Sequence, residues 1–304
     1  MTPYIIGIDI GGTNYRIGAV DRQGLVLGSK VGRSKFLLQA EDPILELGHS
    51  IECFIHEMEG LPAGICIGFP GMVSRDNRIV YSCPLFPVFD NKDIATPLSQ
   101  RFGIPVIAVH DVVSLLTFDI FEHRLFDLNT IVAIYLGTGL GNALYVNGMV
   151  LNGANGVAGE LGHIPWPCED TLCSCGNIGC LELACSGKYL EKVQESYFSD
   201  TDISQIFVQH GNHSVIRDFV DNIAAAIAVE VNILDPDCVV LGGGVLQMEA
   251  FPFDDLLQAL KRHVRKPYPC NSLNVCKAVP DGLAGVKGAG RYMWDWLKGG
   301  GIYD

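Results

Sequence analysis

The sequence predicts an α/β fold made of two lobes that are built alike. Three observations support this prediction: a buried strand followed by a turn rich in glycine and threonine near the N-terminus, a second copy of that pattern in mid-chain, and amphipathic helical patterns between the strands. A chain of 304 residues is long enough for two medium-sized domains with hydrophobic cores. Its 48 % apolar and 18 % charged residues are typical of a folded globular protein.

The chain begins with a predicted β-meander. The apolar segment 4–9 is typical of a buried strand and runs into the glycine-rich turn 10–14, and strands are expected over 16–20 and 25–27 with a polar turn between them. The same order of strands and turns returns over residues 130–151. We interpret the recurrence as an internal duplication, the alternative being two unrelated hairpins.

Helices are predicted between the strands. Apolar residues near a 3.6-residue period predict helices over 43–58 and 214–234, the second capped by Ser214 and ended by Pro236, and another helix over 284–296.

The boundary between the lobes is expected within residues 111–125. We predict an N-terminal lobe over 1–115 and a C-terminal lobe over 116–284 that contains a cysteine-rich segment. A C-terminal helix over 285–298 is expected to pack back onto the N-terminal lobe.

Composition narrows the function. The net charge of −13 argues against a nucleic-acid partner, which requires clustered Lys and Arg. The sequence has no apolar run near the roughly 18 residues that span a bilayer, and its N-terminus lacks the pattern of a signal peptide. With 11 cysteines and no secretion signal, we expect a cytoplasmic protein without a membrane partner, in which clustered cysteines bind metal more often than they form disulfides.

Three glycine-rich turns follow buried strands and together indicate phosphate binding. Glycine lets the backbone approach a polyphosphate and point N–H donors at it, and threonine adds a hydroxyl donor. Tight-turn geometry is the alternative for any one of them. Neither the Walker A nor the Rossmann spacing is present. The turns contain Gly11, Gly12 and Thr13, then Gly137, Thr138, Gly139 and Gly141, then Gly242, Gly243 and Gly244.

Asp9 directly precedes the first of these turns. A carboxylate beside a phosphate loop can hold Mg²⁺, directly or through water. The alternative is an Asp that caps the end of the strand.

These motifs resemble a known superfamily. Residues 9–16 look like the first phosphate motif of actin, hexokinase and Hsp70, residues 137–141 like the second, and 241–244 like the adenosine motif. Segments 156–163 and 173–182 are similar to the signature of the ROK family of repressors, open-reading-frame proteins and kinases. The resemblance covers about residues 4–290.

The resemblance implies a two-lobed actin/hexokinase-like (ribonuclease H-like) fold, with ATP and a sugar in the interdomain cleft. It also implies that MgATP is bound by Asp9, Gly11, Gly12, Thr13, Asn14, Arg16, Gly137, Thr138, Gly139, Gly141, Gly242, Gly243 and Gly244. Kinases of this family are often dimers, so we expect a homodimer.

A zinc site is predicted from one imidazole and three thiolates, a closed tetrahedral set that suits structural Zn²⁺. The family resemblance places zinc on the same positions: His163, Cys173, Cys175 and Cys180. Gly176 and Gly179 let the chain fold tightly between the last two cysteines. Cys168 and Cys185 lie nearby and could compete as ligands, and a group of ordinary buried cysteines is the alternative.

The resemblance also assigns the sugar site. Asp111, which follows the apolar strand 104–109, is the expected general base, since phosphoryl transfer to a hydroxyl needs a group that takes the proton. The residues expected to bind the sugar are His110, Gly139, Glu160, His163 and Glu182.

Three residues depart from the family pattern. His110 and Val113 stand where the family usually has Asn, and Leu85 replaces the Asn of a Pro-Asn-Leu run. These departures concern the identity of the sugar more than the chemistry.

Within the family, the D-allose kinases of bacteria give the nearest resemblance, through Phe69-Pro70, Val73-Ser74, residues 156–165 and Asp235–Asp237. We expect phosphorylation of D-allose to D-allose 6-phosphate. The alternatives are a kinase for N-acetylmannosamine or glucose, or a non-catalytic sugar sensor. A repressor would need an N-terminal helix-turn-helix, and the first phosphate strand already begins at Tyr4.

Overall fold

The computed structural model describes residues 3–167 and 170–299, which form two compact units. Unit 1 contains 3–125, 152–158 and 279–299, and unit 2 contains the described residues of 126–151 and 159–278. The boundary at 125 lies beyond the expected 115, because residues 111–122 form one continuous helix within unit 1.

Unit 1 is built on a five-stranded sheet with the order β3-β2-β1-β4-β8. The first two pairings are antiparallel and the next two are parallel. The strands are β1 (Tyr4–Ile10), β2 (Asn14–Val20), β3 (Val26–Arg33), β4 (Pro62–Phe69) and β8 (Val106–His110). A small second sheet holds β5 (Met72–Val73), β6 (Ile79–Ser82) and β7 (Lys92–Asp93), beside the short turn η1 (Pro87–Phe89).

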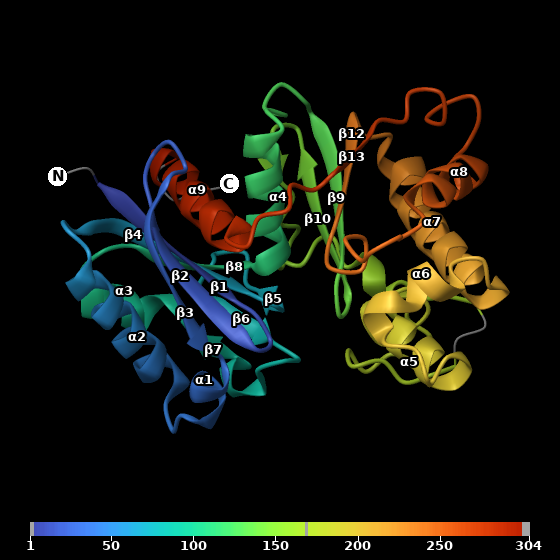
Figure 1. Cartoon of the computed structure of the whole chain (residues 1–304). Helices are drawn as coiled ribbons and strands as arrows, with labels where there is room; N and C mark the ends of the chain where they lie inside the picture. The colour runs from blue at the N-terminus through green and yellow to red at the C-terminus, as the bar shows by residue number, and fades with distance from the viewer. Residues whose placement is uncertain (1–2, 168–169, 300–304) are drawn as a thin grey trace. The chain divides into compact units, whose positions relative to one another are not determined.

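Helices cover both faces of the unit 1 sheet (Figure 1). They are α1 (Lys35–Gln39), α2 (Pro43–Glu57) and α3 (Ala95–Phe102) on one face, and α4 (Asp111–Glu122) and α9 (Ala284–Lys298) on the other. Because side chains alternate along a strand, Ile6, Ile8 and Ile10 of β1 enter the core beneath α2, while Gly7 and Asp9 face α9. A side chain at Gly7 would overlap the backbone of α9, so glycine is required for this close packing.

Unit 2 repeats the same topology. Its sheet has the order β11-β10-β9-β12-β13, again with two antiparallel and two parallel pairings. The shared strand order supports the internal duplication predicted from the sequence. The strands are β9 (Thr130–Leu136), β10 (Leu140–Val146), β11 (Met149–Val150), β12 (Cys238–Gly242) and β13 (Val275–Lys277).

The core of unit 2 lies between this sheet and a layer of helices. They are α5 (Gly187–Tyr197), α6 (Ile206–His210), α7 (Ser214–Leu234) and α8 (Phe253–His263), with short turns η2 (Leu161–His163), η3 (Leu181–Leu183) and η4 (Ile203–Gln205). The predicted N-cap of α7 is wrong. The cap is His213, whose ring nitrogen accepts from the N–H of Val215, and Ser214 is the first helical residue.

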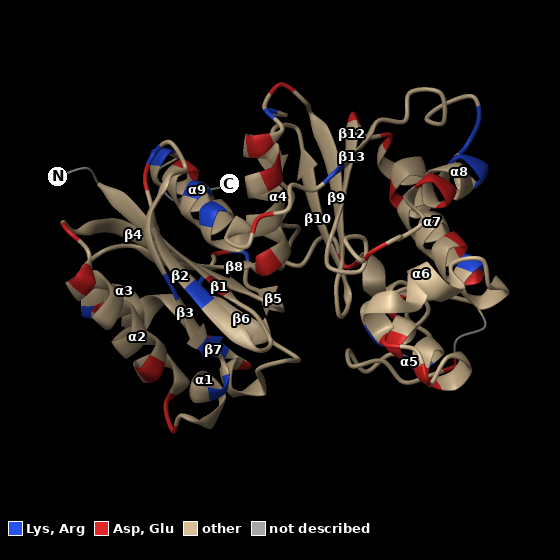
Figure 2. Ribbon diagram, viewed as in Figure 1, with Lys and Arg blue, Asp and Glu red and all other residues tan. Residues whose placement is uncertain are grey.

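Charged residues are spread over the elements of both units, with Lys and Arg interspersed with Asp and Glu (Figure 2). Helix α8 has Asp254 and Asp255 in its first turn and Lys261 and Arg262 in its last, as the helix dipole favours. No helix among residues 3–167 and 170–299 is long and apolar enough to cross a membrane.

Candidate functional site

The first glycine turn of unit 1 is held by backbone and side-chain hydrogen bonds. The N–H of Gly11 donates to the carbonyl of Asn14 at 3.0 Å. Ser34 is fully buried, and its hydroxyl donates to the carbonyl of Gly11 at 2.6 Å while its N–H donates to that of Thr13 at 3.1 Å. Ser34 was not predicted as a site residue, because its contact with the turn is made only in the fold.

Asp9 lies at the end of β1, beside the first turn of α9. Its Oδ2 is 3.8 Å from Nη1 of Arg16 on the neighbouring strand, and a Cβ at Gly285 of α9 would lie 2.6 Å from its Cγ. The pKa of Asp9 is raised to about 6, first by burial and then by the negative charge of Asp111, against the lowering effect of Arg16. A second carboxylate therefore lies close enough to Asp9 to influence its charge.

That second carboxylate, Asp111, is the first residue of α4 and directly follows β8. Its Oδ1 accepts from the N–H of Val112 at 2.8 Å and lies 3.4 Å from Nε2 of His110. Its Cα would be 3.5 Å from a Cβ at Gly68 on β4. Asp111 thus sits at a helix N-terminus, where the dipole favours negative charge.

Two of the residues that depart from the family pattern also lie in this part of unit 1. Leu85 is 41 % exposed, and its Cδ1 would be 3.6 Å from a Cβ at Gly12. Val113 is in the first turn of α4, and its carbonyl accepts from the hydroxyl of Thr117. An apolar side chain therefore lies beside the first phosphate turn.

In unit 2 the second glycine turn is tied to the start of α5. The N–H of Gly187 donates to the carbonyl of Gly137 at 2.8 Å, and the N–H of Lys188 donates to that of Thr138 at 3.1 Å. Within the turn, the N–H of Gly137 donates to the carbonyl of Gly139 at 3.0 Å. These bonds fix the shape of the turn.

Glu182 lies against the same turn. Its Oε2 accepts from the N–H of Leu140 at 2.9 Å, and a Cβ at Gly139 would overlap this oxygen. The structure thus brings two predicted sugar-binding residues, Gly139 and Glu182, into direct contact. Gly141 follows in β10, opposite Tyr135 of β9.

The third glycine turn follows β12. Gly243 has a φ of 97°, and any side chain there would overlap the backbone of Leu136. By contrast, a Cβ at Gly244 would meet no atom of the described residues within 4 Å, and the same holds for Gly137. Steric overlap within the described chain explains why residue 243 is glycine. At Gly137 and Gly244 the space beside the Cα atom is free of described atoms, so a ligand could approach the backbone there.

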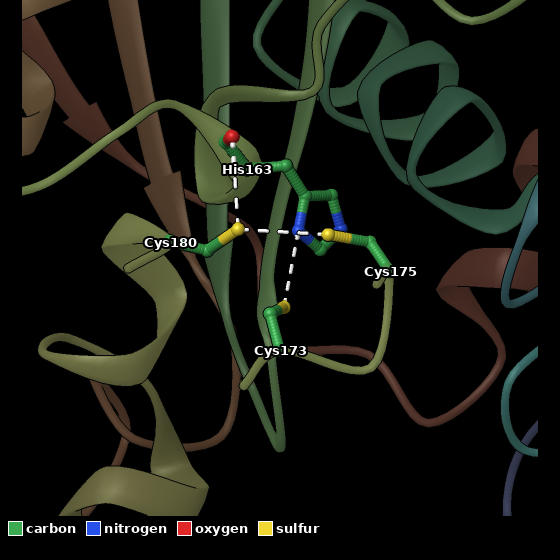
Figure 3. Close-up of side chains that lie close together, drawn as sticks. All are labelled: His163, Cys173, Cys175 and Cys180. Atoms are coloured by element: carbon green, nitrogen blue, oxygen red, sulfur yellow. Dashed lines mark hydrogen bonds between the residues drawn. The ribbon is translucent and has the colours of Figure 1, made fainter. Parts of the chain in front are cut away.

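The four predicted zinc ligands come together in unit 2 (Figure 3). Their ligand atoms all lie within 4.8 Å of one another, with Cys173 Sγ 3.6 Å from Nδ1 of His163 and Cys175 Sγ 3.5 Å from Cys180 Sγ. Thiolates bound to one zinc ion at about 2.3 Å in a tetrahedron lie nearly this far apart. The donor set and its spacing therefore fit a structural zinc ion.

The chain around these ligands is folded tightly. Gly176 and Gly179 have φ values of 93° and 78°, which only glycine adopts readily. Cys185 lies outside the group, and its Sγ donates to the carbonyl of Leu181 at 3.2 Å. Cys168 lies outside the described residues.

Glu160 is attached to the same group. Its Oε2 lies 3.7 Å from Nε2 of His163. The other ring nitrogen of His163, Nδ1, faces the thiol of Cys173. A carboxylate on the second nitrogen is the usual way to orient a metal-binding histidine.

The predicted site residues are thus gathered within each unit. Unit 1 contains Asp9, Arg16, His110, Asp111 and the turn 11–14, and unit 2 contains the two other glycine turns, Glu160, Glu182 and the four predicted zinc ligands.

Comparison with known proteins identifies the family. The family model described as ROK matches residues 5–295. The chain is 28 % identical to a glucokinase of Thermotoga maritima, over 86 % of this chain and 88 % of the relative, and 29 % identical to an N-acetyl-D-glucosamine kinase of Pectobacterium carotovorum, over 93 % and 96 %. The crystal structure of a ROK family glucokinase from Streptomyces griseus in complex with glucose and AMPPNP has a TM-score of 0.79 to this chain at 23 % identity, covering 95 % and 98 % of the two chains, which confirms the predicted hexokinase-like fold. Because the family model spans nearly the whole sequence, this chain is a member of the ROK family.

Proposed function

We propose that this chain transfers the γ-phosphoryl group of MgATP to the 6-hydroxyl of a hexose, and that the hexose is D-allose. The observation that carries the proposal is the placement of Asp111 in unit 1. Its carboxylate is at the N-terminus of α4, and its negative charge adds to burial in raising the pKa of Asp9, beside the first glycine turn. Phosphoryl transfer to a hydroxyl requires a general base close to a magnesium ligand, and Asp111 and Asp9 would provide this pair.

In the proposed reaction, the carboxylate of Asp111 takes the proton of the sugar 6-hydroxyl. At the same time, the 6-oxygen of the sugar forms a bond to the γ-phosphorus of ATP. The bond to the β-phosphate oxygen breaks and ADP leaves. The contact of Oδ1 with the N–H of Val112 and with His110 holds the carboxylate in one orientation.

The nucleotide would be bound by all three glycine turns. Their N–H groups and Thr13 and Thr138 offer donors to the phosphates, and Asp9 offers a carboxylate to Mg²⁺. Bound Mg²⁺ would neutralise phosphate charge.

The sugar would be bound by Glu160, His163, Gly139 and Glu182 in unit 2 and by His110 in unit 1. Zinc on His163 and the three cysteines would have no open coordination position. It would therefore shape the sugar-binding segment without activating water.

The kinase activity is supported by family membership and by the names of relatives, which are a glucokinase and an N-acetyl-D-glucosamine kinase. D-allose as the substrate rests on the resemblance of residues 156–165 and Asp235–Asp237 to D-allose kinases. Leu85, Val113 and His110 replace amide groups of the family pattern, which is compatible with a sugar of altered hydroxyl pattern and equally with a substituted sugar.

A coupled ADP-release assay across D-allose, glucose, N-acetylglucosamine and N-acetylmannosamine tests the proposal. D-allose is expected to give the highest kcat/KM. The variant Asp111→Asn is expected to fold normally and lose at least about a thousandfold in kcat, because it cannot accept the proton.

Asp218→Asn, at an exposed position of α7, is the matched control and should retain full activity. Turnover of Asp111→Asn within tenfold of wild type would contradict the assignment of the base. A higher kcat/KM for another sugar in the panel would replace D-allose and leave the kinase assignment intact.

A further inference from the structure

A buried polar pair lies in the core of unit 2, outside the residues that the sequence assigned to the site. Glu230 on α7 is 8 % exposed and Asn142 on β10 is 2 % exposed. Their strand and helix otherwise contribute apolar side chains to this core, such as Leu140, Leu144 and Val231. A carboxyl group in such surroundings is costly unless its hydrogen bonds are satisfied.

The side-chain amide of Asn142 links three elements. Its Nδ2 donates to the carbonyl of Ala133 on β9 and to Oε2 of Glu230 on α7, both at 3.0 Å. Its Oδ1 is one of two buried side-chain polar atoms without a hydrogen-bond partner among the described residues, the other being Oγ of Ser114. This acceptor would be satisfied by a proton on the neighbouring carboxyl group.

The surroundings of Glu230 favour that proton. Within residues 3–167 and 170–299, Glu230 has no ion pair with Lys, Arg or His. Its pKa is raised to about 7 by burial, against the lowering effect of the hydrogen bond from Asn142. A neutral carboxylic acid can donate its O–H to Oδ1 of Asn142 while its other oxygen accepts from Nδ2.

Asn142 also lies beside the start of the segment that carries Glu160 and His163, two of the predicted sugar ligands. Gly159 has a φ of 92°, and a Cβ there would lie 3.0 Å from Oδ1 and 3.1 Å from the carbonyl oxygen of Asn142. Glu160 follows directly, and its carboxylate lies beside His163. Asn142 is therefore packed closely against the backbone that leads into Glu160.

We propose that the hydrogen-bonded pair of Glu230 and Asn142 is a positioning device, which holds segment 159–163 so that Glu160 and His163 can bind the sugar. This inference rests on the proposed function, because it assumes that the two residues bind sugar. Glu230 and Asn142 act through the segment, so their loss should raise the KM for sugar more than it lowers kcat.

Two variants of Glu230 distinguish a role of its hydrogen bonds to Asn142 from a role of its buried volume alone. Glu230→Gln retains one donor and one acceptor toward Asn142, so its KM for sugar should remain within about twofold of wild type. Glu230→Leu has a similar volume but leaves the amide of Asn142 without this partner, so its KM should rise about tenfold, with kcat within about threefold. A folded Glu230→Leu variant with wild-type KM overturns the proposal. Glu191→Gln, at an exposed position of α5, is the matched control.

Hydrogen exchange of residues 156–166 reports the positioning without catalysis. Exchange should be about tenfold faster in Glu230→Leu and unchanged in Glu230→Gln. This readout applies even if the wild type phosphorylates none of the sugars, so failure of the proposed function and failure of this inference are distinguishable. Unchanged exchange in Glu230→Leu overturns the inference.

Asn142→Asp decides the matter if Glu230→Leu does not fold. This variant places two carboxyl groups together, which can share one proton at low pH and repel each other once both ionise. Its KM for sugar should rise with increasing pH more steeply than that of wild type, as the second carboxyl group ionises. A pH-independent ratio of the two KM values overturns the proposal.

Stability gives an independent check with a defined sign. The pKa of Glu230 in the folded chain lies above its ordinary value of 4.5. Stability contributed by Glu230 is therefore fully present below pH 4.5 and lost as the pH rises through about 7. Between pH 4.5 and about 7, the melting temperature of wild type should fall relative to that of Glu230→Gln. If the two proteins gave parallel curves of melting temperature against pH, Glu230 would not be protonated in the pair.

Discussion

Gly139 and Glu182 show how a single atom can determine which residue a position accepts. The Oε2 atom of Glu182 lies where a Cβ of residue 139 would be, and it accepts the N–H of Leu140 at 2.9 Å. The glycine therefore serves two purposes, since it lies in a predicted phosphate turn and makes room for a proposed sugar ligand.

Gly139→Ala is expected to displace the carboxylate of Glu182 and to reduce kcat/KM for sugar by about a hundredfold or more, equivalent to about 2.7 kcal/mol. Steady-state kinetics at varied sugar concentrations measure this loss. Gly282→Ala is the control, because a Cβ at Gly282 meets no described atom within 4 Å. Activity of a folded Gly139→Ala protein within threefold of wild type would show that the contact has no role.

The sequence predicts those site residues that are recognisable from their immediate neighbours in the chain. Asp9 and Asp111 each follow an apolar strand, and the glycine turns are recognisable from their spacing. Ser34 and Glu230 could not be predicted, because the partners that give them a role, Gly11 and Asn142, are distant in sequence and meet them only in the fold.

At the scale of elements, the segment that carries the predicted zinc ligands has little secondary structure of its own. Residues 164–180 contain no helix or strand in the part that the structure describes, and they are held by isolated bridges such as Pro165 with Cys180 and Leu172 with Ile178. Leu172 and Ile178 are 69 % and 68 % exposed, and the segment carries three of the four predicted zinc ligands, so a bound ion would add a source of order that the secondary structure lacks.

Metal analysis should therefore find about one zinc per chain in wild type and well under one in Cys173→Ser. Removing zinc with a chelator should accelerate hydrogen exchange over residues 160–182, because the bound ion is what orders them. Cys185→Ser serves as the control, since its thiol bonds to Leu181 and not to the group of ligands. An active wild-type enzyme with much less than one zinc per chain would refute the structural role.

Local sequence patterns predict some of the helices closely and fail for others. The periods over 43–58 and 284–296 predict α2 and α9 closely, because each helix buries one face of its own sequence. The expected break near 111–125 falls at the end of that range, at residue 125, because α4 occupies residues 111–122. The apolar residues of α4 pack on α9 and β4, contacts that are distant in sequence. The cap of α7 was missed because Ser is a far commoner cap than His.

Over the whole molecule, the chain crosses between its units four times, near residues 125, 151, 158 and 278. The predicted two-lobe plan could be obtained from the repeated strand pattern, but these crossings could not. Segment 152–158 belongs to unit 1 through long-range contacts, such as that of Gly156 with Val73, which a linear pattern does not encode. The expected homodimer stays a prediction.

Each unit has a core of its own, so a core mutation should weaken one unit more than the other. Phe219 is fully buried in unit 2, and Phe54 is 2 % exposed in unit 1. Phe219→Ala should cost about 3–5 kcal/mol, because it removes a buried aromatic ring and leaves a cavity. Native-state hydrogen exchange should then show lower protection over β9 and α7, with β1 and β4 unchanged. Phe54→Ala should give the reciprocal pattern, and an equal fall of protection in both units for either variant would show that the chain unfolds as one cooperative body.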